Sequence, residues 1–208
     1  MIMVRGPDRA VPRTASHSYR EGMTLLDRLR GRTPLSPAEP PATVPPYHGV
    51  KVYDADEALM AALETFVLQG VRQSKTTVVI ATPEHRQMLR ERLEVWDLGH
   101  AFLGLDAQQT LDRFMRGGLP DPHLFDTVVG QLVRSQAANG LQAFGEMVSL
   151  LWHQGNVEGT YALEKLWSTL QRDVAFPLLC AYASADFEAH PGLEQVCELH
   201  THVEPQAA

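Results

Sequence analysis

Residues 76–93, TTVVIATPEHRQMLRERL, contain a strand followed at once by the start of a helix. The first six residues are apolar or β-branched, a composition typical of a strand covered on both faces. Thr82 then supplies a helix N-cap, and Pro83 takes the first helical position, where its missing N–H has no intrahelical partner to lose. Apolar residues at helical spacing follow. This stretch therefore predicts one strand–helix unit of an α/β fold.

The same alternation of strand and helix recurs along the chain from about residue 47. Short apolar runs predict strands, and apolar residues three or four apart predict the helices between them. The predicted strands are residues 49–53, 76–81, 101–107, 141–146 and 177–183. This order predicts an α/β three-layer sandwich, in which a mainly parallel central sheet of about five or more strands is flanked by helices. A last helix is predicted from Pro191 to Leu199, with His200 and His202 at its solvated end.

The first 46 residues differ from the rest in composition. Seven arginines and three acidic residues up to Arg32 give this part a charge of +4, although the whole chain carries −7. A short helix is predicted over residues 18–30, and six prolines between 34 and 46 then favour an extended linker. We expect a basic, Pro-rich arm over 1–46 and one domain over 47–208. Because the domain is acidic, DNA contact is expected only through the Arg-rich arm.

Location and cofactors are predicted from what the sequence lacks. Its apolar runs are far shorter than the ~20 residues needed to cross a bilayer, and no secretory signal is recognisable. Cys180 and Cys197 show no metal-ligand spacing and suit a reducing compartment. We expect a cytoplasmic protein without a membrane contact, a metal ion or a cofactor.

The candidate ligand-binding residues follow from the predicted topology. In parallel α/β sheets, ligands bind beyond the carboxyl ends of the strands, where the strand order reverses. The residues at or shortly after those ends are Tyr53, Thr82, His85, Asp106, Glu146, Trp152 and Tyr182. They predict a mostly apolar pocket for a small molecule. None of them is assigned a catalytic role.

The turn after the first strand argues against the usual nucleotide sites. Residues 54–58 read DADEA, whereas a phosphate loop needs glycines and a lysine between strand and helix. The three carboxylates of this turn would repel a phosphate. No GxGxxG follows a predicted strand, and no GxSxG supplies a nucleophile elbow. The sequence therefore favours binding over catalysis.

Glu146 has roles that the sequence leaves open. A buried carboxylate costs several kcal/mol unless it finds partners. Glu146 could cap the helix beginning at Met147, or it could line the pocket near Trp152. It could also converge with His85 and Asp106 on a divalent metal in a residual nucleotide or phosphoester hydrolase, although no ligand-spacing motif is present.

Several segments, in order, resemble the MEDS domain, the sensory domain described in methanogens and methylotrophs and in the DcmR-type dichloromethane-responsive regulator. The resemblance spans about residues 47–203. The segments that carry it are 48–71, 76–93, 105–115, 120–133, 141–167 and 176–187.

This resemblance implies a RecA/KaiC-related fold whose nucleotide site is degenerate because the phosphate loop is lost. It also implies a non-enzymatic sensory domain that binds a small organic ligand and relays binding to a signalling or transcriptional partner protein. An interaction module without a ligand is the alternative. A homodimer is compatible with the sequence.

Overall fold

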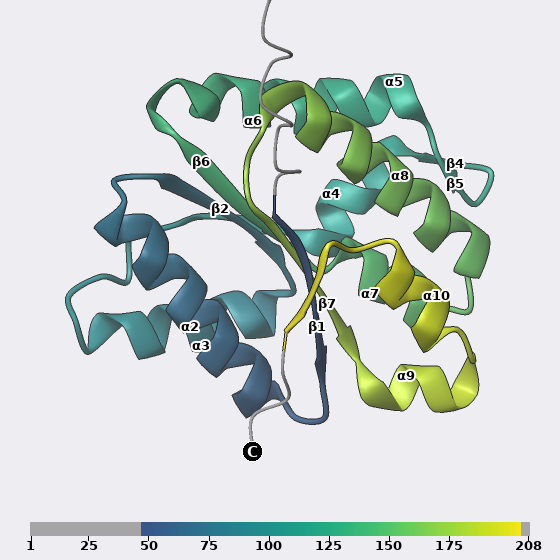
Figure 1. Cartoon of the computed structure of the whole chain (residues 1–208), viewed down its shortest axis with the longest axis horizontal. Coiled ribbons are helices and arrows are strands. Elements are labelled where there is room, and N and C mark those ends of the chain that lie inside the picture. The colour runs from purple at the N-terminus through teal and green to yellow at the C-terminus, as the bar shows by residue number, and fades with distance from the viewer. Residues whose placement is uncertain (1–46, 205–208) are drawn as a thin grey trace, which may run out of the picture. The chain divides into compact units, whose positions relative to one another are not determined.

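A computed structural model describes residues 47–204, and the structural statements below concern this range. Six of its strands form one sheet in the order β3-β2-β6-β7-β1-β8, and every neighbouring pair is parallel (Figure 1). This confirms the predicted α/β fold with a parallel central sheet between helices. The predicted arm and its helix over 18–30 lie outside the described residues.

The strands of the sheet agree closely with the sequence prediction. They are β1 (His48–Tyr53), β2 (Thr76–Ala81), β3 (Leu103–Asp106), β6 (Leu141–Gly145), β7 (Leu178–Ala183) and β8 (His202–Glu204). The first five match the predicted runs to within two residues at each end. The sixth, β8, lies where a solvated helix end was expected. A separate antiparallel hairpin consists of β4 (Met115–Arg116) and β5 (Leu119–Pro120).

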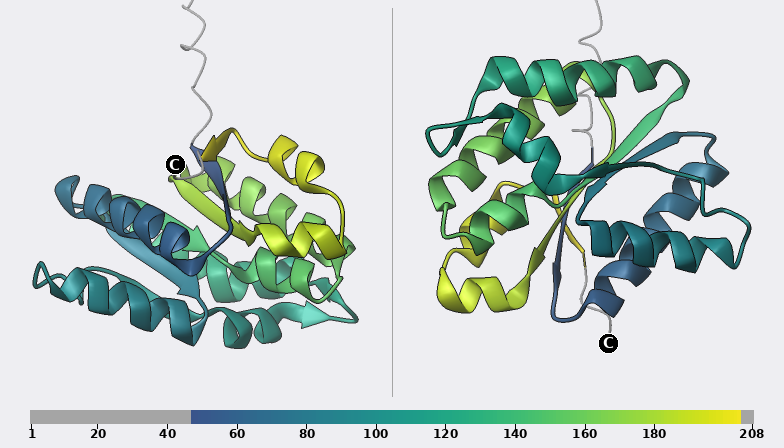
Figure 2. Two further views of the ribbon diagram at one scale, coloured as in Figure 1. Left: turned by 90° about the horizontal axis from the view of Figure 1, so that it is seen from below. Right: turned by 180° about the vertical axis from the view of Figure 1, so that it is seen from behind.

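Helices cover both faces of the sheet (Figure 2). One face carries α2 (Asp56–Arg72) and α3 (Pro83–Glu94). The other face is covered by α4 (Ala107–Phe114), α5 (Pro122–Phe125), α6 (Gln131–Gln136), α7 (Met147–His153), α8 (Val157–Val174), α9 (Ser184–Ala189) and α10 (Leu193–Glu198). A π-helical turn (Asp126–Gly130) joins α5 to α6, and a 3₁₀ turn (Ala137–Asn139) follows α6. Among residues 47–204, no helix has the length and apolar character required to cross a membrane.

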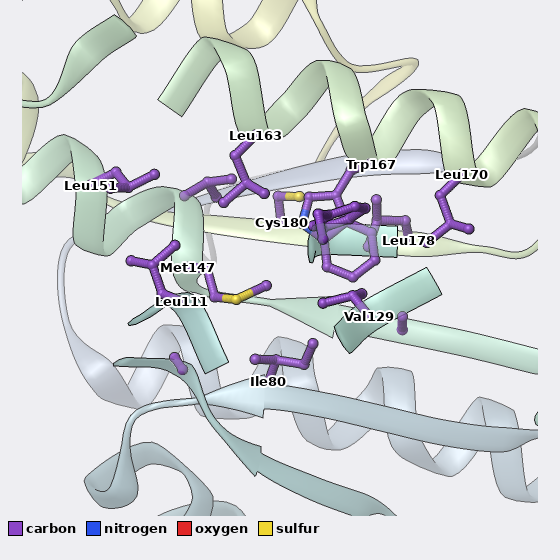
Figure 3. Packing of buried hydrophobic residues seen from close by; sticks show 14 of the residues in the cluster. Ile80, Leu111, Val129, Met147, Leu151, Leu163, Trp167, Leu170, Leu178 and Cys180 are labelled. Carbon is purple, nitrogen blue, oxygen red and sulfur yellow. The ribbon is translucent and has the colours of Figure 1, made fainter. Parts of the chain in front are cut away.

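The protein has two hydrophobic cores, one on each face of the sheet. They reflect the alternation of side chains along the strands. In β2, Val78 and Ile80 face the α8 side, whereas Val79 and Ala81 face the α2 side, and all four are fully buried. Figure 3 shows Ile80 packed on the α8 side in the same layer as Trp167. Burial of each of the Val and Ile side chains contributes about 1.5–3 kcal/mol by removing it from water. This burial on both faces explains why β2 reads as an uninterrupted apolar run.

The strand order places a topological switch point between β2 and β6. From β2 the chain continues through α3 to β3, on one side in the sheet. From β6 it continues through α7 and α8 to β7, on the other side. Because α3 and α7 cover opposite faces, the carboxyl ends of β2 and β6 flank the crevice where such folds bind ligands.

Candidate functional site at the strand ends

Glu146 lies at this switch point, directly after β6, and is 2 % exposed. Its carboxylate makes no capping hydrogen bond to its own helix, α7. It accepts instead from the backbone N–H of Thr82 at 2.9 Å and contacts Nδ1 of His85. The interpretation of Glu146 as a cap for the helix at Met147 is therefore wrong. The Glu146 carboxylate can be buried because Thr82 and His85, which follow the neighbouring strand β2, contact it.

Thr82 connects Glu146 to the first turn of α3. As predicted, Thr82 is the N-cap residue, and its Oγ1 accepts from the backbone N–H of His85 at 3.2 Å. Pro83 follows as the first helical residue. The Glu146 carboxylate thus lies at the N-terminal end of α3, where the helix dipole favours negative charge.

His85 lies between two carboxylates. Its Nδ1 contacts Glu146, and its Nε2 is 3.3 Å from Oδ1 of Asp56. Burial of the ring acts to lower the pKa of His85, but the hydrogen bonds and charges of Glu146 and Asp56 outweigh it, so the pKa is raised. The imidazolium form, which donates from both nitrogens, is therefore favoured.

Asp56 and Tyr53 complete the group. Asp56 is the first residue of α2, and its side chain is 59 % exposed. The Tyr53 ring meets the His85 ring edge-on, with centroids 6.3 Å apart. Burial, followed by the charge of Glu146, raises the pKa of the Tyr53 phenol, which stays neutral. We call Tyr53, Asp56, Thr82, His85 and Glu146 the strand-end cluster. Asp56 was not among the predicted site residues, although it belongs to the carboxylate-rich DADEA turn.

The structure brings four of the seven predicted residues together and places the other three elsewhere. Asp106 forms an ion pair with Arg86 at 3.1 Å and caps α4 by accepting from the N–H of Gln109. Trp152 and Tyr182 belong to the core on the α8 side, with ring centroids 6.2 Å apart. Tyr53 instead belongs to the core on the α2 side, so the three aromatic residues of the predicted set are divided between the two faces of the sheet.

A second buried polar group was not predicted. His48, Glu164, Cys180 and His200 meet on the α8 side, and their possible ligand atoms all lie within 4.8 Å of one another. We call them the His–Glu–Cys cluster. The spacing of the cysteines indicated no such arrangement, because the four residues come from distant parts of the chain.

The position of His200 corrects one prediction. Its side chain was expected at a solvated helix end, but its exposed fraction is 0 %. The cause is that α10 ends at Glu198 and the chain then returns to the sheet as β8. The sequence did contain one indication of a buried polar site, at the residue that His200 contacts. Glu164 lies between Leu163 and Trp167 on the buried face of α8, where a carboxylate is unusual.

The Glu164 carboxylate is ionised despite complete burial. Burial acts to raise its pKa, but the charges of His200 and His48 beside it outweigh the burial, and the pKa is lowered. Tyr182 donates its hydroxyl hydrogen to Oε1 of Glu164 at 2.6 Å. Burial, together with the Glu164 charge, raises the pKa of the Cys180 thiol.

A cavity of about 560 Å³ lies between α2 and the sheet. Its lining includes Ala58, Ala62, Phe66, Lys51, Gln142 and Leu179. None of the seven predicted residues lines it. The volume is in the range of small-molecule pockets, so this cavity is a second place where a ligand would fit.

Comparison with known proteins identifies the protein family of this chain. The sequence profile of the MEDS domain, the methanogen/methylotroph, DcmR sensory domain, matches residues 47–201. The search of curated proteins found no match, and neither did the search of solved structures. The matched segment covers most of the chain and includes the strand-end cluster. The chain therefore belongs to the MEDS family of sensory domains.

Proposed function

We propose that the domain is a non-enzymatic cytoplasmic sensor that binds a small organic ligand at the strand-end cluster and relays binding to a signalling or transcriptional partner. Membership of a sensory family supports the regulatory part of this proposal. The observation that carries the location is the buried pair of Glu146 and His85 at the topological switch point. A buried histidine with a perturbed pKa at such a switch point is typical of functional sites.

The chemistry of the cluster indicates what kind of ligand fits. The Nε2 of His85 is held by Asp56, a mostly exposed side chain that a ligand can displace. A ligand with one hydrogen-bond acceptor would take its place, and its apolar part would lie against the ring of Tyr53. A small, mostly apolar molecule with one polar atom satisfies both contacts.

The cluster also provides a route for relaying the signal. Asp56 begins α2, His85 lies in the first turn of α3, and Glu146 directly precedes α7. These helices cover both faces of the sheet, so a change at the cluster acts on surfaces that a partner can contact. A ligand can shift these helices only if it binds two arrangements of the helices with different affinity.

The contacts of the carboxylates favour binding over hydrolysis. The alternative hydrolase needs Asp106 and Glu146 to share a divalent metal. Asp106 is engaged by Arg86, and Glu146 is engaged by Thr82 and His85. In addition, Asp56 and Glu57 occupy the N-terminus of α2, where they oppose a phosphate.

Calorimetric titration of the full chain tests the proposal. The panel contains dichloromethane, short alcohols and aldehydes, and adenine nucleotides. Binding of an organic compound should weaken at least about tenfold in Glu146→Gln and in His85→Gln, because a charged hydrogen bond contributes about 1.5–3 kcal/mol. Asp106→Asn is the matched control and should keep the wild-type affinity.

A further variant separates the two candidate locations. Ala62→Phe fills the cavity under α2 without touching the strand-end cluster. If Ala62→Phe abolishes binding while Glu146→Gln binds normally, the ligand occupies the cavity and the proposed location is wrong. If no compound binds and the chain captures its partner without one, the interaction module is the correct description.

A further inference from the structure

Three of the distances within the His–Glu–Cys cluster are close to those between neighbouring ligand atoms of a metal coordination shell. Nε2 of His48 is 3.5 Å from Oε2 of Glu164 and 3.6 Å from Sγ of Cys180. Sγ of Cys180 is 3.8 Å from Oε2 of Glu164. In a tetrahedron with metal–ligand bonds of about 2.0–2.3 Å, neighbouring ligand atoms are about 3.3–3.8 Å apart. The three side chains thus hold their ligand atoms close to tetrahedral spacing.

His200 supplies the fourth ligand atom and an independent indication. Its Nδ1 is 2.7 Å from the carbonyl oxygen of Val196, which can only accept, so Nδ1 carries a hydrogen. Its Nε2 is buried without a hydrogen-bond partner and lies 3.5 Å from Oε1 of Glu164. Histidines that bind metals through one nitrogen typically donate the other N–H to such a carbonyl.

The surroundings support the same role. The Tyr182 hydroxyl donates to Oε1 of Glu164, which orients the carboxylate and leaves Oε2 facing His48 and Cys180. Apolar side chains enclose the group, and Figure 3 shows Cys180 beside Trp167 in the α8-side core. Such a shell excludes water from the ligands.

We propose that His48, Glu164, Cys180 and His200 bind one divalent transition-metal ion, for which Zn²⁺ is the best fit. Two imidazoles, a thiolate and a carboxylate are ligand types that Zn²⁺ accepts in four-coordinate sites. On binding, the Cys180 thiol and the protonated Nε2 of His200 release their protons to solvent, and the thiolate and the neutral imidazoles bond to the ion. One carboxylate and one thiolate then balance the two positive charges, so the buried group is neutral.

The elements that supply the ligands indicate what the ion does. His48 lies in β1, Cys180 in β7 and Glu164 in α8, whereas His200 lies between α10 and β8. An ion at this point ties the C-terminal segment to the sheet and to α8. Four protein ligands fill the coordination shell, as in structural sites. This role is separate from ligand sensing at the strand-end cluster.

The first experiment measures metal binding by the full chain without an affinity tag. Elemental analysis after loading with Zn²⁺ and gel filtration should find about one ion per chain. A Zn²⁺ concentration 100-fold above Kd should raise the thermal midpoint by about 5–10 °C relative to chelator-treated protein. A chain that retains no zinc and shows no thermal shift overturns the proposal.

Cobalt substitution assigns the ligands. The Co²⁺-loaded chain should show a thiolate-to-cobalt charge-transfer band and the intense visible bands of tetrahedral Co²⁺. Cys180→Ser should abolish the thiolate band, while Cys197→Ser, the matched control, should keep it. His200→Gln should weaken binding at least about tenfold, whereas His100→Gln, at an exposed histidine, should leave it unchanged. Circular dichroism confirms that each variant is folded. A band that survives in folded Cys180→Ser places the ion elsewhere and contradicts the proposal.

Discussion

The carboxylate of Glu146 accepts a hydrogen bond from the backbone N–H of Thr82 at 2.9 Å, across the boundary between β6 and β2. This contact joins two strand–helix units that lead to opposite faces of the sheet. Glu146 therefore connects the two strand–helix units that meet at the switch point. His85, the second partner of Glu146, extends the connection to Asp56 at the start of α2.

Neutralising Glu146 should destabilise the fold. Hydrogen bonds to a charged group contribute about 1.5–3 kcal/mol, so Glu146→Gln should lower the free energy of unfolding by about that amount. Urea denaturation followed by circular dichroism measures it. Glu188→Gln, at an exposed position, should change the value by less than about 0.5 kcal/mol. Equal effects of the two substitutions would show that the buried contacts contribute nothing.

The stability contributed by His85 should depend on pH in one direction. Its pKa in the folded state is raised above the value of about 6.5 expected in the unfolded chain. The imidazolium contacts with Glu146 and Asp56 therefore contribute fully below pH ~6.5, and the contribution declines as pH rises through the folded pKa. The difference in unfolding free energy between wild type and His85→Gln should be larger at pH 6 than at pH 9. A difference that does not vary with pH would contradict the raised pKa.

Trp152 should act through packing. Its ring is fully buried against Tyr182 and Phe187, and its Nε1–H donates to the carbonyl of His190 at 3.1 Å. Trp152→Ala should cost about 3–5 kcal/mol of stability. Trp96, which is 61 % exposed, provides the control, and Trp96→Ala should cost less than about 1 kcal/mol. Thermal and urea denaturation of both variants would reveal comparable losses if Trp152 were instead a loosely packed pocket residue.

Asp106→Asn should show how much Asp106 stabilises the fold by capping α4 and how much by its ion pair. Asparagine can still accept from the N–H of Gln109, so the start of α4 should persist. The ion pair with Arg86 is lost, and we expect a decrease of about 1 kcal/mol in the free energy of unfolding. A much larger loss, or an altered ligand affinity, would show that Asp106 has a role at the strand-end cluster.

The parts of the fold that the sequence predicts are those specified by local pattern. The strand at 76–81 is bounded by Thr82 and Pro83, whose capping chemistry is local, so its limits are predicted correctly. In contrast, β8 has three residues and no apolar run, and it exists because it pairs with β1. A sequence pattern carries no information on such a distant partner.

The strand-end cluster was predictable in part for the same reason. Tyr53 ends β1, and Thr82, His85 and Glu146 follow β2 or β6 of the same parallel sheet, so topology alone brings them to one edge. The His–Glu–Cys cluster instead depends on how α8 is rotated and on where the C-terminal segment returns. These features arise from packing between distant elements, which explains why the burial of His200 was missed.

Hydrogen–deuterium exchange with and without a compound that binds in calorimetry tests the central claim most directly. Binding at the strand-end cluster should change the protection of residues 54–60, 82–88 and 146–153 together, because these segments begin α2, α3 and α7. The three changes should disappear in Glu146→Gln. Changes confined to residues 61–73, along the cavity under α2, would contradict the claim that the strand-end cluster is the sensory site.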